Sequence, residues 1–165
     1  MKGTLIFHAA GIVRNKKGYL FLGRSGAGKS TICNLSKKTQ VIDDDTVYLA
    51  KIKARACIYN PHNQKFYKIR RIFIIFQSKS IRIKKASITE VLRFMLEDSV
   101  IAFRNNSSVG LSRKSKYIFN FVMDMLHSAT CHKLCFKKKG GFWKVIDKLE
   151  CNYKEPYAKD LIRTI

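Results

Sequence analysis

A glycine-rich stretch near the N-terminus has the residue types and spacing of a phosphate-binding loop: Gly23-Arg24-Ser25-Gly26-Ala27-Gly28-Lys29-Ser30, followed by Thr31. It fits the pattern Gly-x4-Gly-Lys-Ser/Thr at every fixed position. Glycines let the backbone turn so that successive N–H groups point inward at an anion. Lys29 can then reach the outer phosphates of a nucleotide, and the Ser30 hydroxyl can ligate Mg²⁺. The residues predicted to contact the nucleotide are Gly23, Ser25, Gly26, Ala27, Gly28, Lys29, Ser30 and Thr31.

The flanks of this stretch agree with the motif. The apolar segment Gly18–Leu22 precedes it and is typical of a buried strand, and a helix is predicted from Lys29 to Ser36 or Lys38. A strand, a loop and a helix in this order are the context that the motif requires. The alternative is an ordinary glycine turn before a helix.

Three adjacent carboxylates follow the predicted helix. Asp43, Asp44 and Asp45 stand between the apolar segments Gln40–Ile42 and Thr46–Leu49, which we expect to form one continuing strand. Their mutual repulsion is costly unless a cation or a proton relieves it. One helix and a return strand bring them back beside the phosphates and Mg²⁺. The alternative is an acidic turn.

The remaining pattern predicts a single α/β domain over residues 1–165, with a mixed sheet in which a hairpin leads into the loop. Ser87 and Glu90 form a capping box that begins a helix. Other predicted elements are a strand over Thr4–Val13, a turn at Asn15–Gly18, a turn at Asn60–Asn63, a buried strand over Ile72–Phe76 preceded by Arg70 and Arg71, a half-exposed strand over Gln77–Lys85, a loop over Arg104–Lys116, a helix over Ile118–Leu126, a strand over Cys131–Phe136, a turn at Lys137–Gly141, and a strand or helix start at Phe142–Ile146.

Composition narrows the class of protein. Hydrophobic residues make up 46% of the chain, which is typical of a folded domain. No apolar run is long enough for a membrane span and no signal peptide is recognisable, so the expected location is the cytoplasm. The formal net charge of +22 would attract nucleic acid, an anionic membrane or an acidic substrate. An AT-rich coding sequence, which favours Lys, Ile and Asn, explains the same charge without any function.

Five cysteines form no recognisable disulfide framework, and we expect reduced thiols. His127, Cys131, His132 and Cys135 could form a zinc cluster, but a second ligand pair of the usual spacing is missing. The alternation of Cys131–Phe136 favours a strand in which cysteine is a small apolar residue.

Together, these segments resemble the catalytic domain of the HPr kinase/phosphorylase family, which is related to the nucleotide fold of ATP-dependent phosphoenolpyruvate carboxykinase. The matching features are His8 at the end of a strand, the loop Gly23–Ser30 after a hairpin, and Asp44-Asp45 before Thr46-Val47. The closing segment, Cys131–Phe136 through Phe142–Ile146, is similar to short members of that family. The family's second, Glu-x-Arg-Gly signature is absent from this sequence.

The resemblance implies ATP-dependent transfer of a phosphoryl group to a serine hydroxyl of a protein or peptide, with Mg²⁺. It implies that Asp44 is the base, that Asp45 assists with Mg²⁺ alongside Ser30, and that His8 orients or charge-balances the carboxylates; Lys29 neutralises the phosphates. Short relatives phosphorylate a serine of a precursor peptide, so a ribosomal peptide is an expected acceptor.

Two other functions stay open at this stage: a kinase of a small molecule or of nucleic-acid ends, and an ATP-binding adaptor without transfer. Nucleic acid is the less favoured partner, and a homo-oligomer is compatible with the sequence.

Overall fold

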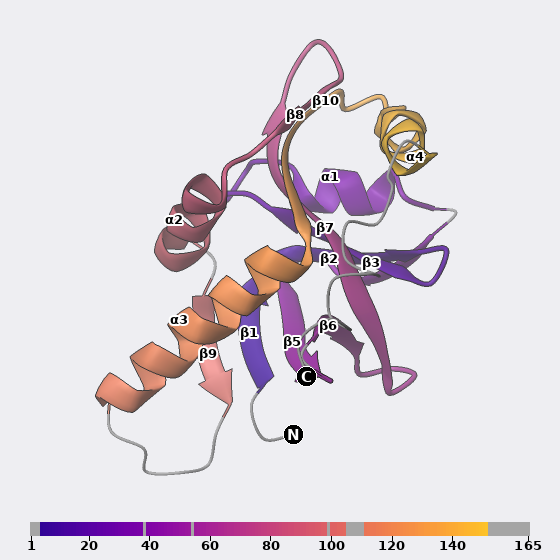
Figure 1. Cartoon of the computed structure of the whole chain (residues 1–165). Coiled ribbons are helices and arrows are strands. Elements are labelled where there is room, and N and C mark those ends of the chain that lie inside the picture. The colour runs from indigo at the N-terminus through magenta and orange to yellow at the C-terminus, as the bar shows by residue number, and fades with distance from the viewer. Residues whose placement is uncertain (1–3, 38, 54, 99, 105–110, 152–165) are drawn as a thin grey trace, which may run out of the picture.

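The computed structural model describes residues 4–37, 39–53, 55–98, 100–104 and 111–151. Its strands are β1 (Thr4–His8), β2 (Ala10–Arg14), β3 (Lys17–Leu22), β4 (Gln40–Asp43), β5 (Thr46–Ile52), β6 (Arg55–Asn60), β7 (Lys65–Gln77), β8 (Arg82–Lys85), β9 (Val100–Arg104) and β10 (Thr130–Phe136). Its helices are α1 (Lys29–Asn34), α2 (Ile88–Asp98), α3 (Leu111–Ser128) and α4 (Phe142–Cys151). The predicted α/β class is confirmed: the structure is a curled, mixed sheet with helices packed against it (Figure 1).

Strand β7 connects the two halves of the sheet. Its first residues pair antiparallel with β6, and β6 continues the sheet through β5 and β1 to β9. Its later residues lie between β3 and β10, both parallel to it. Strands β2 and β4 extend the β3 side, and β8 pairs with β10. Parallel strands are covered on both faces, which explains the unbroken apolar run from Ile72 to Ile75.

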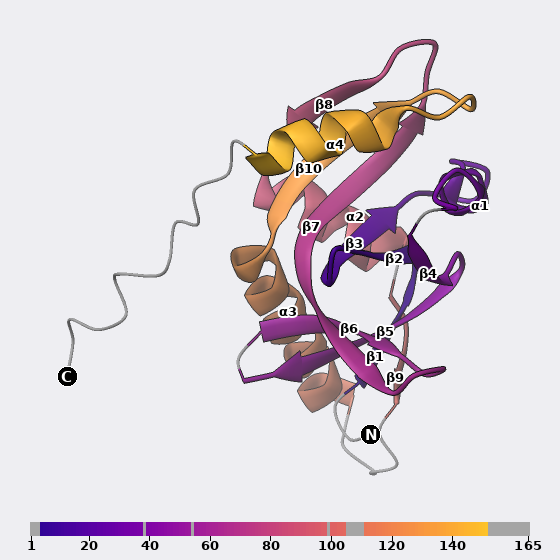
Figure 2. The same cartoon turned by 90° about the vertical axis from the view of Figure 1, so that its right-hand side faces the viewer.

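The two faces of the sheet carry separate cores. One core packs α2 and α3 through side chains such as Val91, Met95 and Val122 against Leu20, Leu22 and their neighbours. The other packs α1 and α4 against the opposite face, around Phe21, Phe73, Phe136 and Phe142. Figure 2 shows α4 and α1 on a different side of the sheet from α3. Alternation along the strands divides the apolar residues between these two cores.

The hairpin that leads into the glycine-rich stretch is confirmed. Strands β2 and β3 pair antiparallel and are joined by Asn15 and Lys16, whose φ angles are +50° and +60°. Two consecutive positive φ angles match the right-handed twist of a two-residue hairpin. Strand β3 therefore enters the loop as the second arm of a hairpin.

Two predicted strands are each divided in the structure. The strand expected over Thr4–Val13 breaks at Ala9, because β1 pairs with β5 and β9 whereas β2 pairs with β3 and β4. The strand expected through the aspartates breaks at Asp44 and Asp45. In both places the chain passes from one half of the sheet to the other.

Helix boundaries also differ from the predictions. Helix α1 ends at Asn34, short of Ser36, and Phe142–Ile146 begins a helix. Helix α3 begins at Leu111, within the segment predicted as a loop; residues 105–110 of that segment lie outside the described residues.

The other predicted segments agree more closely. The half-exposed strand expected over Gln77–Lys85 is confined to Arg82–Lys85. The turn at Asn60–Asn63, the capping box at Ser87 and Glu90, and the strand over Cys131–Phe136 are confirmed. In the part of the chain that the structure describes, no helix is long and apolar enough to cross a membrane.

Candidate phosphate-binding site

The glycine-rich stretch lies at the carboxyl ends of the three parallel strands. It follows β3 directly, and Gln77 at the end of β7 donates from Nε2 to the Gly26 carbonyl oxygen at 3.1 Å. The end of β10 lies beside the end of β7, where the Ser78 N–H donates to the Phe136 carbonyl oxygen at 2.8 Å. In α/β sheets this edge is where ligands bind.

The backbone conformation favours glycine at two positions of the stretch. Gly26 and Gly28 have φ angles of +77° and +104°, which side chains rarely adopt. A Cβ on Gly28 would lie 2.7 Å from Cζ of Phe136 and 2.9 Å from Nε2 of Gln77, whereas a Cβ on Gly26 would meet nothing within 4 Å. The loop is therefore seated against β7 and β10 at Gly28 and open to solvent at Gly26.

Lys29 is held inside this loop. Its side chain is 7% exposed, and Nζ donates to the Gly23 carbonyl oxygen at 2.8 Å. Burial lowers the pKa of Lys29 from its ordinary value, while the carboxylates of Asp45 and Asp44 act in the opposite direction. The amine therefore lies in a poorly hydrated position, with two carboxylates near enough to affect its charge.

The aspartates form a turn between β4 and β5. Asp43 Oδ1 accepts the backbone N–H groups of Asp45 at 2.8 Å and Thr46 at 2.7 Å, so this carboxylate closes the turn. This is the local hydrogen bonding by which Asp favours turns. Asp44 is half-buried and Asp45 is exposed. The acidic-turn alternative is therefore correct for the backbone, and the turn presents Asp44 and Asp45 near Lys29.

His8, at the end of β1, is brought to the same turn. Its Nδ1 lies 3.2 Å from Oδ1 of Asp45, and the N–H of Ala9 donates to the Asp45 carbonyl oxygen at 3.0 Å. The backbone hydrogen bond from Ala9, the residue between β1 and β2, thus holds the end of β1 against the acidic turn. The structure therefore places His8 against Asp45, and Asp45 is near enough to Lys29 to affect the pKa of the lysine.

The other predicted site residues lie on the loop or at the start of α1. Ser25 and Ser30 are exposed, and Ala27 and Thr31 are half-buried. The first N–H groups of a helix lack intrahelical acceptors and can bind an anion. Because α1 has only six residues, we expect its macrodipole to add little. The exposed Ser30 has a hydroxyl, and Asp44 and Asp45 have carboxylates; oxygen atoms of these kinds are the ligands that Mg²⁺ prefers.

Two neighbours of the loop were missed at the level of sequence. Gln77 contacts Gly26, and Phe136 lies against Gly28. Each of these residues ends a strand that runs parallel to β3, the strand that leads into the loop. Parallel pairing between segments distant in the sequence leaves no trace in local periodicity, so the sequence could not indicate these contacts.

Arg70 and Arg71 were predicted to lie directly before the buried strand Ile72–Phe76. The structure instead places them inside β7, where both bond to Glu150 of α4. Arg71 is 1% exposed and also donates to Thr130 and to the Leu149 carbonyl oxygen. This buried network fixes the end of α4 to the sheet, away from the loop.

The zinc hypothesis gains no support. Among the described residues, no group of three or more His, Cys, Asp or Glu side chains could hold a metal ion. Cys131 belongs to the core under α3 whereas His132 packs against Phe73, so these neighbours lie on opposite faces of β10.

A cavity of about 430 Å³ lies at the start of β10, the opposite end of that strand from the loop. Its lining includes Arg71, Lys85, His127, Thr130 and His132. It is therefore separate from the candidate phosphate site.

Comparison with protein families and with curated proteins finds no match to this sequence. Among solved structures, the HPr(Ser) kinase/phosphatase from Coxiella burnetii is similar over 88% of this chain and 98% of that chain, with a TM-score of 0.42 and 11% identity. This is a distant likeness of fold, from which no function follows for this chain.

Proposed function

We propose that this protein is an ATP-dependent kinase that transfers the γ-phosphoryl group to a serine hydroxyl of a protein or peptide. The observation that carries the proposal is the position of Lys29, buried in a glycine loop at the ends of parallel strands, with the Asp44-Asp45 turn beside it. Phosphoryl transfer needs positive charge on the phosphates and a carboxylate near the acceptor hydroxyl, and this edge supplies both.

The loop residues are proposed to bind the nucleotide. Backbone N–H groups between Gly23 and Ser30 would hold the phosphates, since the stretch has the glycines that let them converge. Lys29 would exchange its hydrogen bond to the Gly23 carbonyl oxygen for the outer phosphates, a stronger charge-assisted partner. Ser30 and Asp45 would hold Mg²⁺, which neutralises charge on the transferred group.

Asp44 is the proposed base. A base must have a free carboxylate oxygen facing the acceptor, and Asp43 is less suited because its Oδ1 accepts two backbone N–H groups. Asp45 is engaged by His8 at 3.2 Å, which would orient it toward the metal. Asp44 is then the aspartate of this turn that is available to accept the serine proton.

The described residues are proposed to form one domain, because β7 belongs to both halves of the sheet. The site draws on both halves: His8 comes from β1, in the half that β6 joins to β7, and the loop follows β3 in the other. The two halves must therefore fold together for the site to form.

The test is incubation of the purified protein with γ-labelled ATP, Mg²⁺ and a lysate of its source cells, followed by mass spectrometry of the labelled product. We expect one labelled polypeptide, phosphorylated on serine. Asp44→Asn should abolish transfer and leave nucleotide binding largely intact, whereas Lys29→Ala should weaken both. Asp124→Asn and Lys37→Ala change an exposed aspartate and an exposed lysine outside the site and are matched controls.

Two outcomes would reject the proposal. Label confined to nucleic acid or to small metabolites would identify a different acceptor class. Binding of ATP with no transferred label, in a lysate in which an added control kinase is active, would identify an adaptor.

A further inference from the structure

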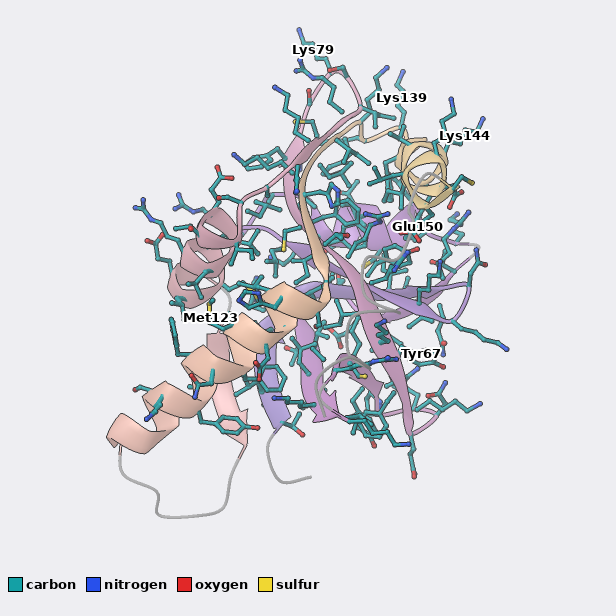
Figure 3. All side chains as sticks on the ribbon, in the orientation of Figure 1. Tyr67, Lys79, Met123, Lys139, Lys144 and Glu150 are labelled. Carbon is teal, nitrogen blue, oxygen red and sulfur yellow. The ribbon has the colours of Figure 1, made fainter. Side chains whose placement is uncertain are left out.

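Two lysine-bearing segments lie beside the candidate phosphate site. The loop from β7 to β8 carries Lys79, and the turn from β10 to α4 carries Lys137, Lys138 and Lys139. Figure 2 shows these segments, α1 and the β4–β5 turn following one another down one side of the molecule. In Figure 3, Lys79, Lys139 and Lys144 project outward around this end. We call Lys79 and Lys137–Lys139 the lysine rim.

Packing contacts fix the lysine rim to the site. A Cβ built on Gly140 would lie 3.5 Å from Cδ2 of Leu35, just after α1. A Cβ built on Gly141 would lie 3.2 Å from Cδ1 of Ile81, in the β7–β8 loop. The turn after β10 thus contacts both the segment after α1 and the β7–β8 loop. The lysines of the rim follow β7 and β10, and the last residues of these two strands lie against the glycine loop.

The lysine rim carries uncompensated charge. Residues 71–89 and 125–146 contain no aspartate or glutamate. Among the ion pairs of the described residues, Lys133 of β10 is paired with Glu90, whereas none involves a lysine of the rim. Like charges held together in this way favour binding of an anionic partner.

We infer that the lysine rim is a docking surface for an acidic segment of the acceptor polypeptide. This inference rests on the proposed function and deepens it. Ser30 belongs to the candidate phosphate site, and Leu35 contacts the turn that carries Lys137–Lys139. These two residues are five positions apart, and a rise of about 1.5 Å per residue separates them by roughly 8 Å. An extended peptide covers that distance in about two or three residues. The acidic residues should therefore begin about three residues from the acceptor serine.

The side chains of this surface favour a polypeptide over a nucleic acid. Single-stranded nucleic acids bind grooves that combine cations with aromatic stacking platforms. The exposed Phe76 is one residue from Gln77 in β7, so it lies on the opposite face from the loop contact that Gln77 makes. A lysine ammonium is a compact point charge that attracts carboxylates and phosphates alike, so the position of the aromatic side chain, and not the lysines, favours the polypeptide.

The experiment measures binding and transfer separately. Fluorescein-labelled peptides carry one serine and a run of aspartates beginning about three residues before or after it; control peptides have asparagine in place of aspartate. A single-stranded RNA with the same number of negative charges is the third probe. Binding is followed by anisotropy at low and physiological salt, and transfer by γ-labelled ATP.

The test variant is Lys137→Glu, Lys138→Glu and Lys139→Glu combined. The matched control combines Lys53→Glu, Arg55→Glu and Lys65→Glu, which lowers the formal charge equally at exposed positions in or next to the β5–β6 and β6–β7 turns. We expect an aspartate peptide to bind the wild type, and the test variant to lose about tenfold or more in affinity while the control changes by less than about threefold. ATP binding should be unchanged in both.

Equal loss in both variants would overturn the inference, because the attraction would then be one of net charge. So would stronger, rim-dependent binding of the RNA, or serine phosphorylation that ignores flanking aspartates and the rim substitutions; this last result leaves the kinase proposal standing. Rim-dependent peptide binding without any transfer would support docking and contradict the kinase.

Discussion

Substituting Gly28 by alanine tests whether the glycine loop is seated on the strand ends. Alanine at φ +104° costs about 1–2 kcal/mol of folding free energy. Its methyl group would also lie 2.7 Å from Phe136 and 2.9 Å from Gln77, and overpacking of that kind costs about 1–3 kcal/mol. The sum predicts a loss of about 2–5 kcal/mol for Gly28→Ala.

Gly26→Ala is the matched control. Its φ of +77° imposes the same kind of backbone strain, but a methyl group there meets nothing within 4 Å. It should lose only about 1–2 kcal/mol. The difference between the two variants isolates the contact with β7 and β10.

The assay is urea unfolding of both variants and the wild type, monitored by the fluorescence of Trp143, with thermal unfolding as a second measure. Each kcal/mol corresponds to a shift of about 2–4 °C in Tm for a chain of this size. Equal losses for the two variants would refute the reasoning, because backbone strain alone would then explain both. A small loss for Gly28→Ala together with full nucleotide binding would refute it as well.

Three further variants test other parts of the structure. Glu150→Gln should lose about 3 kcal/mol in urea unfolding at pH 7, because it leaves Arg71 buried without its carboxylate. Burial raises the pKa of Glu150, but the hydrogen bonds and charges of Lys17, Arg71 and Arg70 together lower it below its ordinary value, so the difference between variant and wild type should vanish as pH falls through that lowered value. Burial lowers the pKa of His132 to about 4, so unfolding free energy should fall by about 3 kcal/mol between pH 6.5 and 4, and His132→Phe should flatten that slope in urea titrations across this range. Trp143→Phe removes the bond from Nε1 to Ser36 Oγ, and thermal unfolding should show a loss of about 1–2 kcal/mol.

Local patterns were sufficient to predict the elements that local chemistry specifies. The Ser87 capping box, the turn after Asn60 and the alternating strand of β10 depend on residues a few positions apart. The glycine motif similarly predicted a strand, a turn and a helix start, because its backbone needs positive φ at fixed positions. What these patterns could not supply was the length of α1, since tertiary packing rather than propensity decides where a six-residue helix ends.

Long-range pairing explains most of the remaining differences. Thr4–Val13 is predominantly apolar and has the pattern of one strand, yet its two ends pair with different strands and it must break at Ala9. Arg71 is preceded by another arginine, a pattern typical of a solvated strand edge. Its burial follows only from Glu150, which is distant in the sequence and which α4 brings to it. Neither the strand pairing of Thr4–Val13 nor the contact between Arg71 and Glu150 is indicated by neighbouring residues in the sequence.

The acidic segment shows how such a break produces a candidate site. A continuous strand through Asp43, Asp44 and Asp45 would send alternate side chains to opposite faces of the sheet. The turn instead uses Asp43 for backbone hydrogen bonds and leaves Asp44 and Asp45 at the same corner as Lys29. His8 reaches that corner because the chain also breaks at Ala9, whose N–H bonds to Asp45. The two places where the predicted strands were wrong are thus the two places that bring the proposed catalytic side chains to the phosphate loop.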